Sequence, residues 1–252
     1  MTKKFLYLDQ AILTVMLQCE TPEIVIGRIR NALHNGAEAF GLQVESLKAE
    51  YQNEDIYKKI FQEMRGKPSY VTNYRYKSNQ GKKDEDLAKE LLTLAKCGAT
   101  LCDVMGDLFD EQEDEMAISE HAIERQMRLI EELHQNGAEI LMSSHIGKFT
   151  PAERVLEIAF EHKRRGADIS KIVTIAENME QQIENLRITN LLKNELGIPF
   201  LFLCGGECSI HRRLGMQLGN CMQLCVYEHD AFSTYAQPLL STSKIIRNDL
   251  GF

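Results

Sequence analysis

Several features that define whole classes of protein are missing from this sequence of 252 residues. No apolar run approaches the roughly 18 residues that a membrane-spanning helix needs, and the first ten residues lack the continuous apolar stretch of a secretory signal. Basic residues are in the minority, with 29 Lys and Arg against 37 Asp and Glu and a formal charge of −8. No cluster of Lys and Arg stands out, which argues against nucleic-acid binding. We expect a cytoplasmic protein with neither a membrane nor a nucleic-acid partner.

Cysteine is sparse and odd in number, with seven residues over the whole chain. An odd count at wide spacing argues against a disulfide framework. Cys204 with Cys208 and Cys221 with Cys225 form two C-x3-C pairs that neighbouring strands could bring together as metal ligands. Structural zinc sites usually use the tighter C-x2-C spacing, and buried cysteine is ordinary in strands. We therefore expect no metal site.

Short apolar or β-branched runs recur along the chain. There are eight of them, at residues 12–18, 38–44, 68–75, 99–104, 138–145, 169–176, 198–204 and 223–227. Their starts lie about 25 to 39 residues apart, which leaves room for one strand, one helix and two loops. The amphipathic stretches between them repeatedly close on a glycine just before the next run, at Gly36, Gly98, Gly137, Gly166 and Gly197. Glycine readily adopts the left-handed conformation that ends a helix, so these positions indicate five copies of one connection.

Strands joined by single helices form parallel sheets, and eight such units favour a closed barrel over an open doubly wound sheet. No glycine-rich phosphate loop follows any run, which weakens the dinucleotide-binding version of the open sheet. With no linker or second domain in view, residues 1–252 are expected to form a single (β/α)8 TIM barrel of the α/β class. Residues 5–8, Phe-Leu-Tyr-Leu, could add a short strand that closes the barrel floor.

Two residues near strand ends suggest chemistry, because reactive side chains of such barrels project toward the face where each strand runs into its helix. Lys171 lies inside an apolar run, where burial would favour the neutral amine. A neutral amine attacks carbonyl carbons, so Lys171 is a candidate for Schiff-base chemistry. His145 ends the preceding run and could move a proton in a neighbouring intermediate. Both also have ordinary interpretations, a lysine head that reaches solvent and a histidine that hydrogen-bonds in a loop.

A family resemblance runs through the same residues. The stretch 142–145, Met-Ser-Ser-His, followed by Thr-Pro at 150–151, resembles the Met-Ser-x-His…Thr-Pro stretch of type I 3-dehydroquinate dehydratases. The run 167–172, Ala-Asp-Ile-Ser-Lys-Ile, is similar to that family's lysine strand. Segments 74–77, 212–219 and 233–237 resemble further parts of the family in the same order.

The resemblance implies a lyase that dehydrates 3-dehydroquinate to 3-dehydroshikimate, a step of the shikimate pathway of aromatic amino acid biosynthesis, with no metal or organic cofactor. Lys171 would form the Schiff base and His145 would move the protons. The small anionic keto acid would be held by four further residues, Arg75, Arg212, Ser233 and Gln237. Lys171, Arg75 and Arg212 would make the pocket basic, and a homodimer is an open possibility.

The sequence also departs from the family. Gly41 and Gln43 stand where the family carries a Glu-x-Arg pair that reaches the substrate, and Asn79 stands where it has a Glu on the catalytic histidine. An amide does not stabilise an imidazolium as a carboxylate does, although Glu45 or another acid could compensate. Two alternatives therefore stay open: a Schiff-base dehydratase or aldolase on a different keto acid, and a catalytically impaired barrel that binds a small carboxylate. The acidic run 107–115 is interpreted as a solvated approach to a helix.

Overall fold

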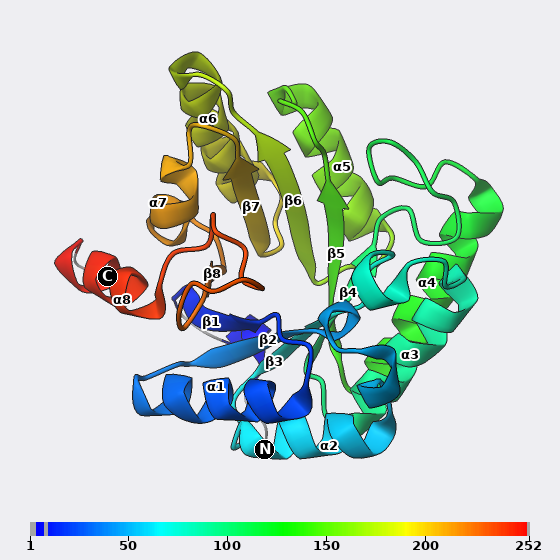
Figure 1. The fold of residues 1–252 in the computed structure, drawn as a ribbon. Helices are drawn as coiled ribbons and strands as arrows, with labels where there is room; N and C mark the ends of the chain where they lie inside the picture. Colours follow the sequence, from blue (N-terminus) through cyan, green and yellow to red (C-terminus); the bar gives the residue numbers. More distant parts are fainter. Residues whose placement is uncertain (1–3, 8–9, 251–252) are drawn as a thin grey trace.

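The computed structural model describes residues 4–7 and 10–250, and an eight-stranded parallel sheet forms its centre (Figure 1). The strands are β1 (Ile12–Leu17), β2 (Ala39–Gln43), β3 (Ser69–Thr72), β4 (Leu101–Met105), β5 (Glu139–His145), β6 (Ile169–Ile175), β7 (Phe200–Gly205) and β8 (Met222–Cys225). Their order is β7-β6-β5-β4-β3-β2-β1-β8, and the sheet curls into a nearly closed barrel. The predicted (β/α)8 barrel is confirmed, and each predicted run overlaps one strand.

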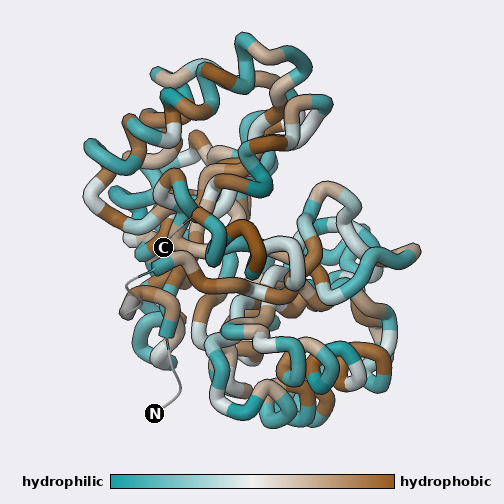
Figure 2. The backbone as a smooth tube through the Cα atoms, turned by 90° about the vertical axis from the view of Figure 1, so that its left-hand side faces the viewer, coloured by the Kyte–Doolittle hydropathy of each residue, from teal (hydrophilic) through white to brown (hydrophobic). Residues whose placement is uncertain are grey.

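Helices follow the strands and surround the barrel (Figure 1). They are α1 (Pro22–His34), α2 (Glu54–Glu63), α3 (Asp84–Cys97), α4 (Glu120–Gln135), α5 (Ala152–Arg164), α6 (Met179–Glu195), α7 (Ile210–Leu218) and α8 (Leu240–Asp249), with 3-10 helices η1 (Phe5–Tyr7), η2 (Val44–Ser46), η3 (Ala49–Tyr51) and η4 (Lys77–Asn79). Hydrophilic and hydrophobic residues alternate along the outer helices, as amphipathic elements require (Figure 2). None of the helices in the described part of the chain is long and apolar enough to cross a membrane.

The barrel interior is apolar at one end and carries polar residues from β4, β5 and β6 at the other. Side chains alternate along each strand, so every second residue points inward. Inward residues form one apolar cluster that reaches the carboxyl ends of β1, β7 and β8 through Met16, Leu203 and Leu224. Every strand contributes to it: Ile12, Met16, Ala39, Tyr70, Leu101, Leu141, Ile169, Leu201, Leu203, Met222 and Leu224. Two residues further along β4, β5 and β6 the inward positions are Asp103, Ser143 and Lys171. The polar layer therefore lies toward the carboxyl ends of the strands, the end at which barrels place their chemistry.

The segment before β1 closes the floor without forming a strand. The predicted strand at residues 5–8 is wrong, because Phe5–Tyr7 form η1, while Leu8 lies outside the described residues. The Phe5 side chain is nevertheless buried in the interior cluster. The backbone N–H of Phe5 donates to Glu139 Oε2 at 2.8 Å and not to the backbone of a strand. The Glu139 carboxylate thus accepts a backbone N–H that a strand would have paired with a neighbouring strand.

Side-chain hydrogen bonds join β7 to β8 where the barrel closes. Asn220 Oδ1 accepts from the Phe202 N–H and its Nδ2 donates to the Phe202 carbonyl, both at 2.9 Å. The Cys221 N–H donates to the Phe200 carbonyl, also at 2.9 Å. A Cβ at Gly215 would lie 2.4 Å from Asn220 Nδ2, so a glycine lets α7 pack against this amide. The hydrogen bonds between Asn220 and Phe202 therefore form a bridge that holds α7 beside β7.

We expect Asn220→Ala to lower the free energy of unfolding by about 2 to 3 kcal/mol, because it leaves the buried N–H and C=O of Phe202 without partners. Urea unfolding followed by circular dichroism measures the change. Asn194→Ala, at an exposed position of α6, is the matched control and should change the free energy by less than about 0.5 kcal/mol. Equal stabilities of the two variants would show that the bridge contributes nothing.

Candidate functional site

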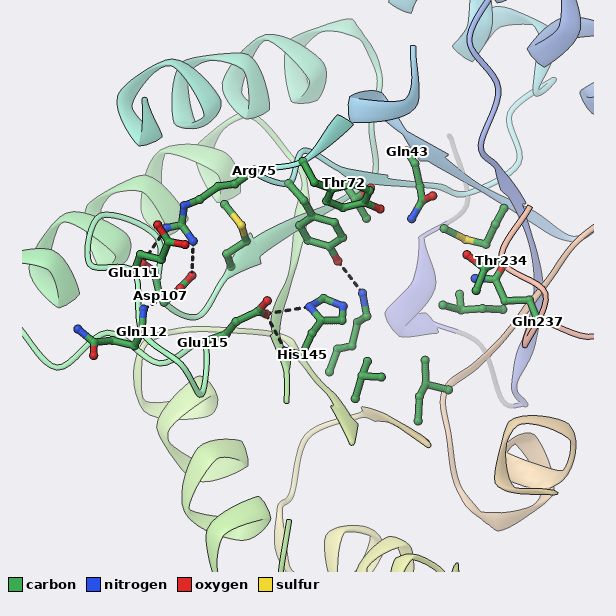
Figure 3. A pocket seen from close by; sticks show the side chains of 18 of the residues that line it. Gln43, Thr72, Arg75, Asp107, Glu111, Gln112, Glu115, His145, Thr234 and Gln237 are labelled. Atoms are coloured by element: carbon green, nitrogen blue, oxygen red, sulfur yellow. Dashed lines mark hydrogen bonds and ion pairs between the residues drawn. The ribbon is translucent and has the colours of Figure 1, made fainter. Parts of the chain in front are cut away.

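A pocket of about 510 Å³ lies at the carboxyl ends of the strands (Figure 3). Every strand lends it at least one side chain: Met16, Gln43, Thr72, Met105, His145, Lys171, Val173, Leu203 and Leu224. Of the residues predicted from the sequence, the structure brings five to the pocket lining: Lys171, His145, Arg75, Arg212 and Gln237. Ser233 is not among the lining residues.

Lys171 lies deep in this pocket, with only 4% of the residue exposed. Its Nζ donates to Tyr74 Oη at 2.6 Å, to Tyr70 Oη at 3.0 Å and to Asp103 Oδ2 at 3.2 Å. An ammonium has three hydrogens, and these three acceptors satisfy all of them. The amine is therefore enclosed, and its surroundings are polar, unlike the apolar burial that the sequence suggested.

Asp103 is the counter-charge of the lysine and is just as deeply buried. Its Oδ2 also accepts the hydroxyls of Tyr70 and Tyr74, and its Oδ1 accepts the Ser143 hydroxyl at 2.5 Å. Burial and the neighbouring Asp103 raise the pKa of both tyrosines well above its ordinary value, so both phenols keep their protons. The sequence analysis missed Asp103, although it stands inside the apolar run 99–104 as Lys171 does inside its own.

His145 ends β5, and a carboxylate holds it in place (Figure 3). Glu115 Oε2 lies 2.8 Å from His145 Nδ1 and accepts the backbone N–H of the same residue at 2.7 Å. The imidazole stands edge-on to the Tyr74 ring, with 5.1 Å between the centroids. Because Nδ1 faces the carboxylate, Nε2 is the ring nitrogen left for a ligand.

Asn79, at the family's glutamate position, and Glu45, the suggested replacement, are both engaged elsewhere. The side-chain amide of Asn79 donates to the Tyr74 carbonyl at 3.0 Å and is fully buried. Glu45 accepts the Thr72 hydroxyl at 2.9 Å, and burial raises the pKa of its carboxyl group to about 7. Neither hydrogen-bonds the imidazole in the described part of the chain, so Glu115 alone supplies that carboxylate.

Glu115 is the last residue of the acidic run 107–115. The interpretation of that run as a solvated approach to a helix is wrong for Glu115, because its carboxylate binds His145. Its backbone adopts a left-handed φ of 48°, which is strained for a residue with a side chain. The Ser144 hydroxyl donates to its carbonyl at 2.9 Å, and a Cβ at Gly106 would lie 2.5 Å from the same oxygen. The loop is therefore pressed against β5, which no sequence spacing indicates.

Arg75 faces the pocket, but its guanidinium is already engaged. Its Nε and Nη2 donate to the carboxylate oxygens of Asp84, each at 2.8 Å, and its Nη1 donates to Asp107 Oδ1 at 2.8 Å. Nη2 also donates to the Asp107 carbonyl at 3.0 Å, so four of the five N–H groups have partners. Arg75 ties the start of the acidic run to α3.

Arg212, on α7, is the unpaired cation among the pocket residues that the structure describes. Its Nε donates to the Cys204 carbonyl at 3.0 Å, and burial lowers the pKa of its guanidinium below the ordinary value. Lys171 and Arg75 are neutralised by aspartates, so the prediction of a basic pocket is wrong. One guanidinium, that of Arg212, is therefore available. The lining also carries four acidic residues, two of them paired with Arg75 and His145: Asp107, Glu111, Glu113 and Glu115.

The loop before α8 turns two polar residues toward the pocket and one away. Gln237 lines the pocket, is 5% exposed and has no partner for its Oε1 among the described residues. Thr234 lines it too, and its hydroxyl oxygen accepts from Gln18 Nε2 at 2.7 Å. The Ser233 hydroxyl oxygen accepts from the Asp230 N–H at 2.9 Å and so closes a turn outside the pocket.

The β2 side of the pocket is uncharged. Gly41 points inward, and a Cβ there would lie 2.2 Å from Met16 Sδ, so the methionine occupies the space of a longer side chain. Gln43 lines the pocket, and its Oε1 accepts from Gln18 Nε2 at 2.6 Å. The Met16 thioether and the Gln43 amide therefore occupy the places of the two charged residues that the family of the sequence resemblance carries.

The four cysteines of the two C-x3-C pairs are all free thiols. Cys204 Sγ accepts from Asn185 Nδ2 at 3.2 Å, and Cys225 Sγ donates to the Thr14 carbonyl at 3.4 Å. Across residues 4–7 and 10–250, no group of three or more His, Cys, Asp or Glu side chains is placed to hold a metal ion.

A small pocket at the carboxyl face of a (β/α)8 barrel, with an enclosed lysine and a carboxylate-held histidine, defines an enzyme that acts on small molecules. The sequence model of the family described as type I 3-dehydroquinase matches residues 13–241. The chain therefore belongs to the type I 3-dehydroquinase family and is an enzyme of the hydro-lyase class. Among curated proteins, none matches this sequence.

Solved structures of similar fold include several 3-dehydroquinate dehydratases. The one from Geobacillus kaustophilus has a TM-score of 0.80 at 16% identity, covering 96% of this chain and 91% of that one. The type I protein from Clostridium difficile, solved with covalently modified comenic acid, has a TM-score of 0.79 at 15% identity, covering 96% and 92%. The one from Aquifex aeolicus has a TM-score of 0.73 at 18% identity, covering 95% and 99%. At these identities the likeness shows the fold.

Proposed function

We propose that this chain dehydrates 3-dehydroquinate to 3-dehydroshikimate through a Schiff base on Lys171. The observation that carries the proposal is the pairing of an enclosed lysine with a carboxylate-held histidine on neighbouring strands, in a chain of the dehydroquinase family. The remaining expectations go with it: a step of the shikimate pathway in the cytoplasm, no cofactor, and a homodimer as the assembly to test.

The chemistry assigns one role to each group. The Lys171 amine adds to the ketone carbon, and loss of water gives an iminium that draws electrons from the adjacent C2 carbon. His145 Nε2 removes a C2 proton, then returns it to the C1 hydroxyl as this group leaves as water. Glu115 stabilises the imidazolium that exists between the two transfers. Hydrolysis of the imine releases the product and restores the amine.

Charge orients the substrate in the pocket. Arg212 binds the carboxylate, because a planar guanidinium suits it and no carboxylate of the described residues pairs with this guanidinium. Gln237 accepts a ring hydroxyl with its unpartnered Oε1. Arg75 and Ser233 act indirectly. Arg75 holds the loop that carries Glu115, and Ser233 shapes the loop that carries Gln237.

Borohydride added with 3-dehydroquinate should fix a covalent mass on Lys171, and Lys171→Ala should lower kcat by on the order of 10³-fold or more. Mass spectrometry of peptides reads the adduct, and the ultraviolet absorbance of the conjugated product reads turnover. Lys89→Ala, at an exposed lysine of α3 outside the pocket lining, is the control and should keep both. Persistent turnover in Lys171→Ala, together with no adduct in the unchanged protein, would contradict the Schiff-base mechanism.

Glu115→Gln should lower kcat by about 10² to 10⁴-fold with little change in KM, because an amide does not stabilise the imidazolium that forms during proton transfer. Steady-state kinetics over a range of 3-dehydroquinate concentrations separates the two constants. Glu120→Gln, at an exposed residue of α4, is the control. An unchanged kcat in Glu115→Gln would remove the carboxylate from the mechanism, and binding without turnover in the unchanged protein would favour the impaired barrel.

A second candidate function keeps the Schiff base but changes the substrate. Met16 fills the space beside Gly41, and Gln43 is bound to Gln18, so the β2 side offers no charge for ring hydroxyls. This arrangement favours a keto acid with fewer hydroxyls, processed as a dehydratase or an aldolase would. The pocket end at Arg212 would hold the carboxylate of either substrate.

Borohydride trapping with a panel of ketone-bearing carboxylates separates the two candidates. We expect 3-dehydroquinate to be trapped with the largest second-order rate constant, by about tenfold or more over acids that lack its ring hydroxyls. The adduct on Lys171, quantified by mass spectrometry, is the measurement. A hydroxyl-poor acid that is trapped faster would establish the second candidate and reject the first.

A further inference from the structure

The hydrogen bonds that enclose Lys171 form a path for a proton that the dehydration steps do not use. We propose that the Tyr74 hydroxyl conducts a proton between Lys171 and Asp103, so that the buried ion pair becomes a neutral amine and a neutral acid when a ketone arrives. This inference rests on the proposed Schiff-base function and makes Tyr74 a catalytic residue that touches the reacting nitrogen.

Contacts around the lysine create the need for such a path. An ammonium has no lone pair and cannot attack a carbonyl carbon, so one proton must leave before the imine forms. Each of the three hydrogens on Nζ meets an oxygen, of Tyr74, Tyr70 or Asp103. The shortest of these contacts, 2.6 Å, is to Tyr74 Oη, whose own proton is donated to Asp103 Oδ2. One hydroxyl therefore bridges donor and acceptor, through two contacts that are each shorter than the direct 3.2 Å contact between Nζ and Asp103 Oδ2.

The structure distinguishes Tyr74 from Tyr70, although both hydroxyls contact the same two groups. Tyr70 lies 3.0 Å from Nζ and packs in the apolar cluster of the barrel interior, away from the pocket lining. Tyr74 lines the pocket and stands edge-on to the His145 ring. Its backbone N–H is held by Glu45 Oε2 at 3.4 Å. A substrate ketone that reaches Lys171 from the pocket therefore meets the Tyr74 hydroxyl.

The forward transfer moves two protons and leaves the net charge unchanged. Nζ gives a proton to Tyr74 Oη while Tyr74 gives its own to Asp103 Oδ2, which yields an amine, a phenol and a carboxylic acid. The high pKa of the buried phenol keeps Tyr74 neutral before and after the transfer. The amine then forms a C–N bond with the ketone carbon, and the oxygen takes the proton that the nitrogen loses.

The return transfer completes the imine. The C–O bond of the carbinolamine breaks as the Asp103 proton travels back through Tyr74 to the leaving hydroxyl, which departs as water. An iminium remains on Lys171, and the Asp103 carboxylate is restored beside it. In sum, one ammonium and one ketone become one iminium and one water, with no outside acid or base.

Tyr74→Phe tests the proposal, and Tyr70→Phe is its matched control, since each removes one hydroxyl from both Lys171 and Asp103. Rapid mixing with 3-dehydroquinate and quenching in borohydride measures the rate at which the Lys171 adduct forms, read by mass spectrometry over pH 6 to 9. We expect Tyr74→Phe to slow adduct formation by on the order of 10²-fold at neutral pH and less at higher pH, where hydroxide removes the proton. Tyr70→Phe should slow it by less than about fivefold.

The outcomes separate this inference from the proposed function. Adduct formation in Tyr74→Phe at the unchanged rate at every pH overturns the proton path, while the Schiff base itself stands. Equal slowing in both variants also overturns it, because the two hydroxyls would then serve only to anchor Asp103. Failure of the unchanged protein to form any adduct overturns the proposed function, and the proton path with it. Circular dichroism and urea unfolding confirm that each variant is folded.

Discussion

The ion pair between Lys171 and Asp103 is the constraint on which the interior of the barrel depends. Removing two charges from water costs several kcal/mol for each ion, and the cost is offset only where the remaining polar atoms are satisfied. Tyr70, Tyr74 and Ser143 meet that requirement from two further strands. Four neighbouring strands, β3 to β6, therefore carry polar residues at one level, above an apolar floor, while β1, β7 and β8 remain apolar there through Met16, Leu203 and Leu224.

The same rule of paired charges determines what the pocket can receive. Asp103 balances Lys171, and Asp84 with Asp107 balances Arg75, so these positive charges do not attract a substrate from a distance. Arg212 is left as the available cation among the described pocket residues. A ligand with one carboxylate therefore has one available cation to bind in the pocket. The overall charge of −8 does little to oppose this binding, because salt screens exposed charges that lie more than about 10 Å away.

The parts of this molecule that the sequence predicted are those fixed by local patterns. Glycines at helix ends and the spacing of apolar runs sufficed for the barrel, and a charged residue inside an apolar run pointed to Lys171. Asp103 also lies inside an apolar run, so the same pattern could have identified it. Glu115 was not, because its place beside His145 depends on a left-handed backbone and on a contact between its carbonyl and β5. The pairing of Arg75 with α3 is likewise a property of the folded chain.

The position of Glu115 changes how the departures from the family are interpreted. Asn79 lies where a carboxylate was expected, yet its amide is bound to the Tyr74 carbonyl and the histidine has its carboxylate from the loop after β4. Loops at this face of a barrel vary freely while inward strand residues hold the site, so a charge can move from one loop to another with its chemistry preserved. The absent glutamate is therefore no argument for an inactive barrel. The uncharged β2 side, where Met16 has taken the space next to Gly41, is the departure without such a replacement, and it bears on which substrate fits.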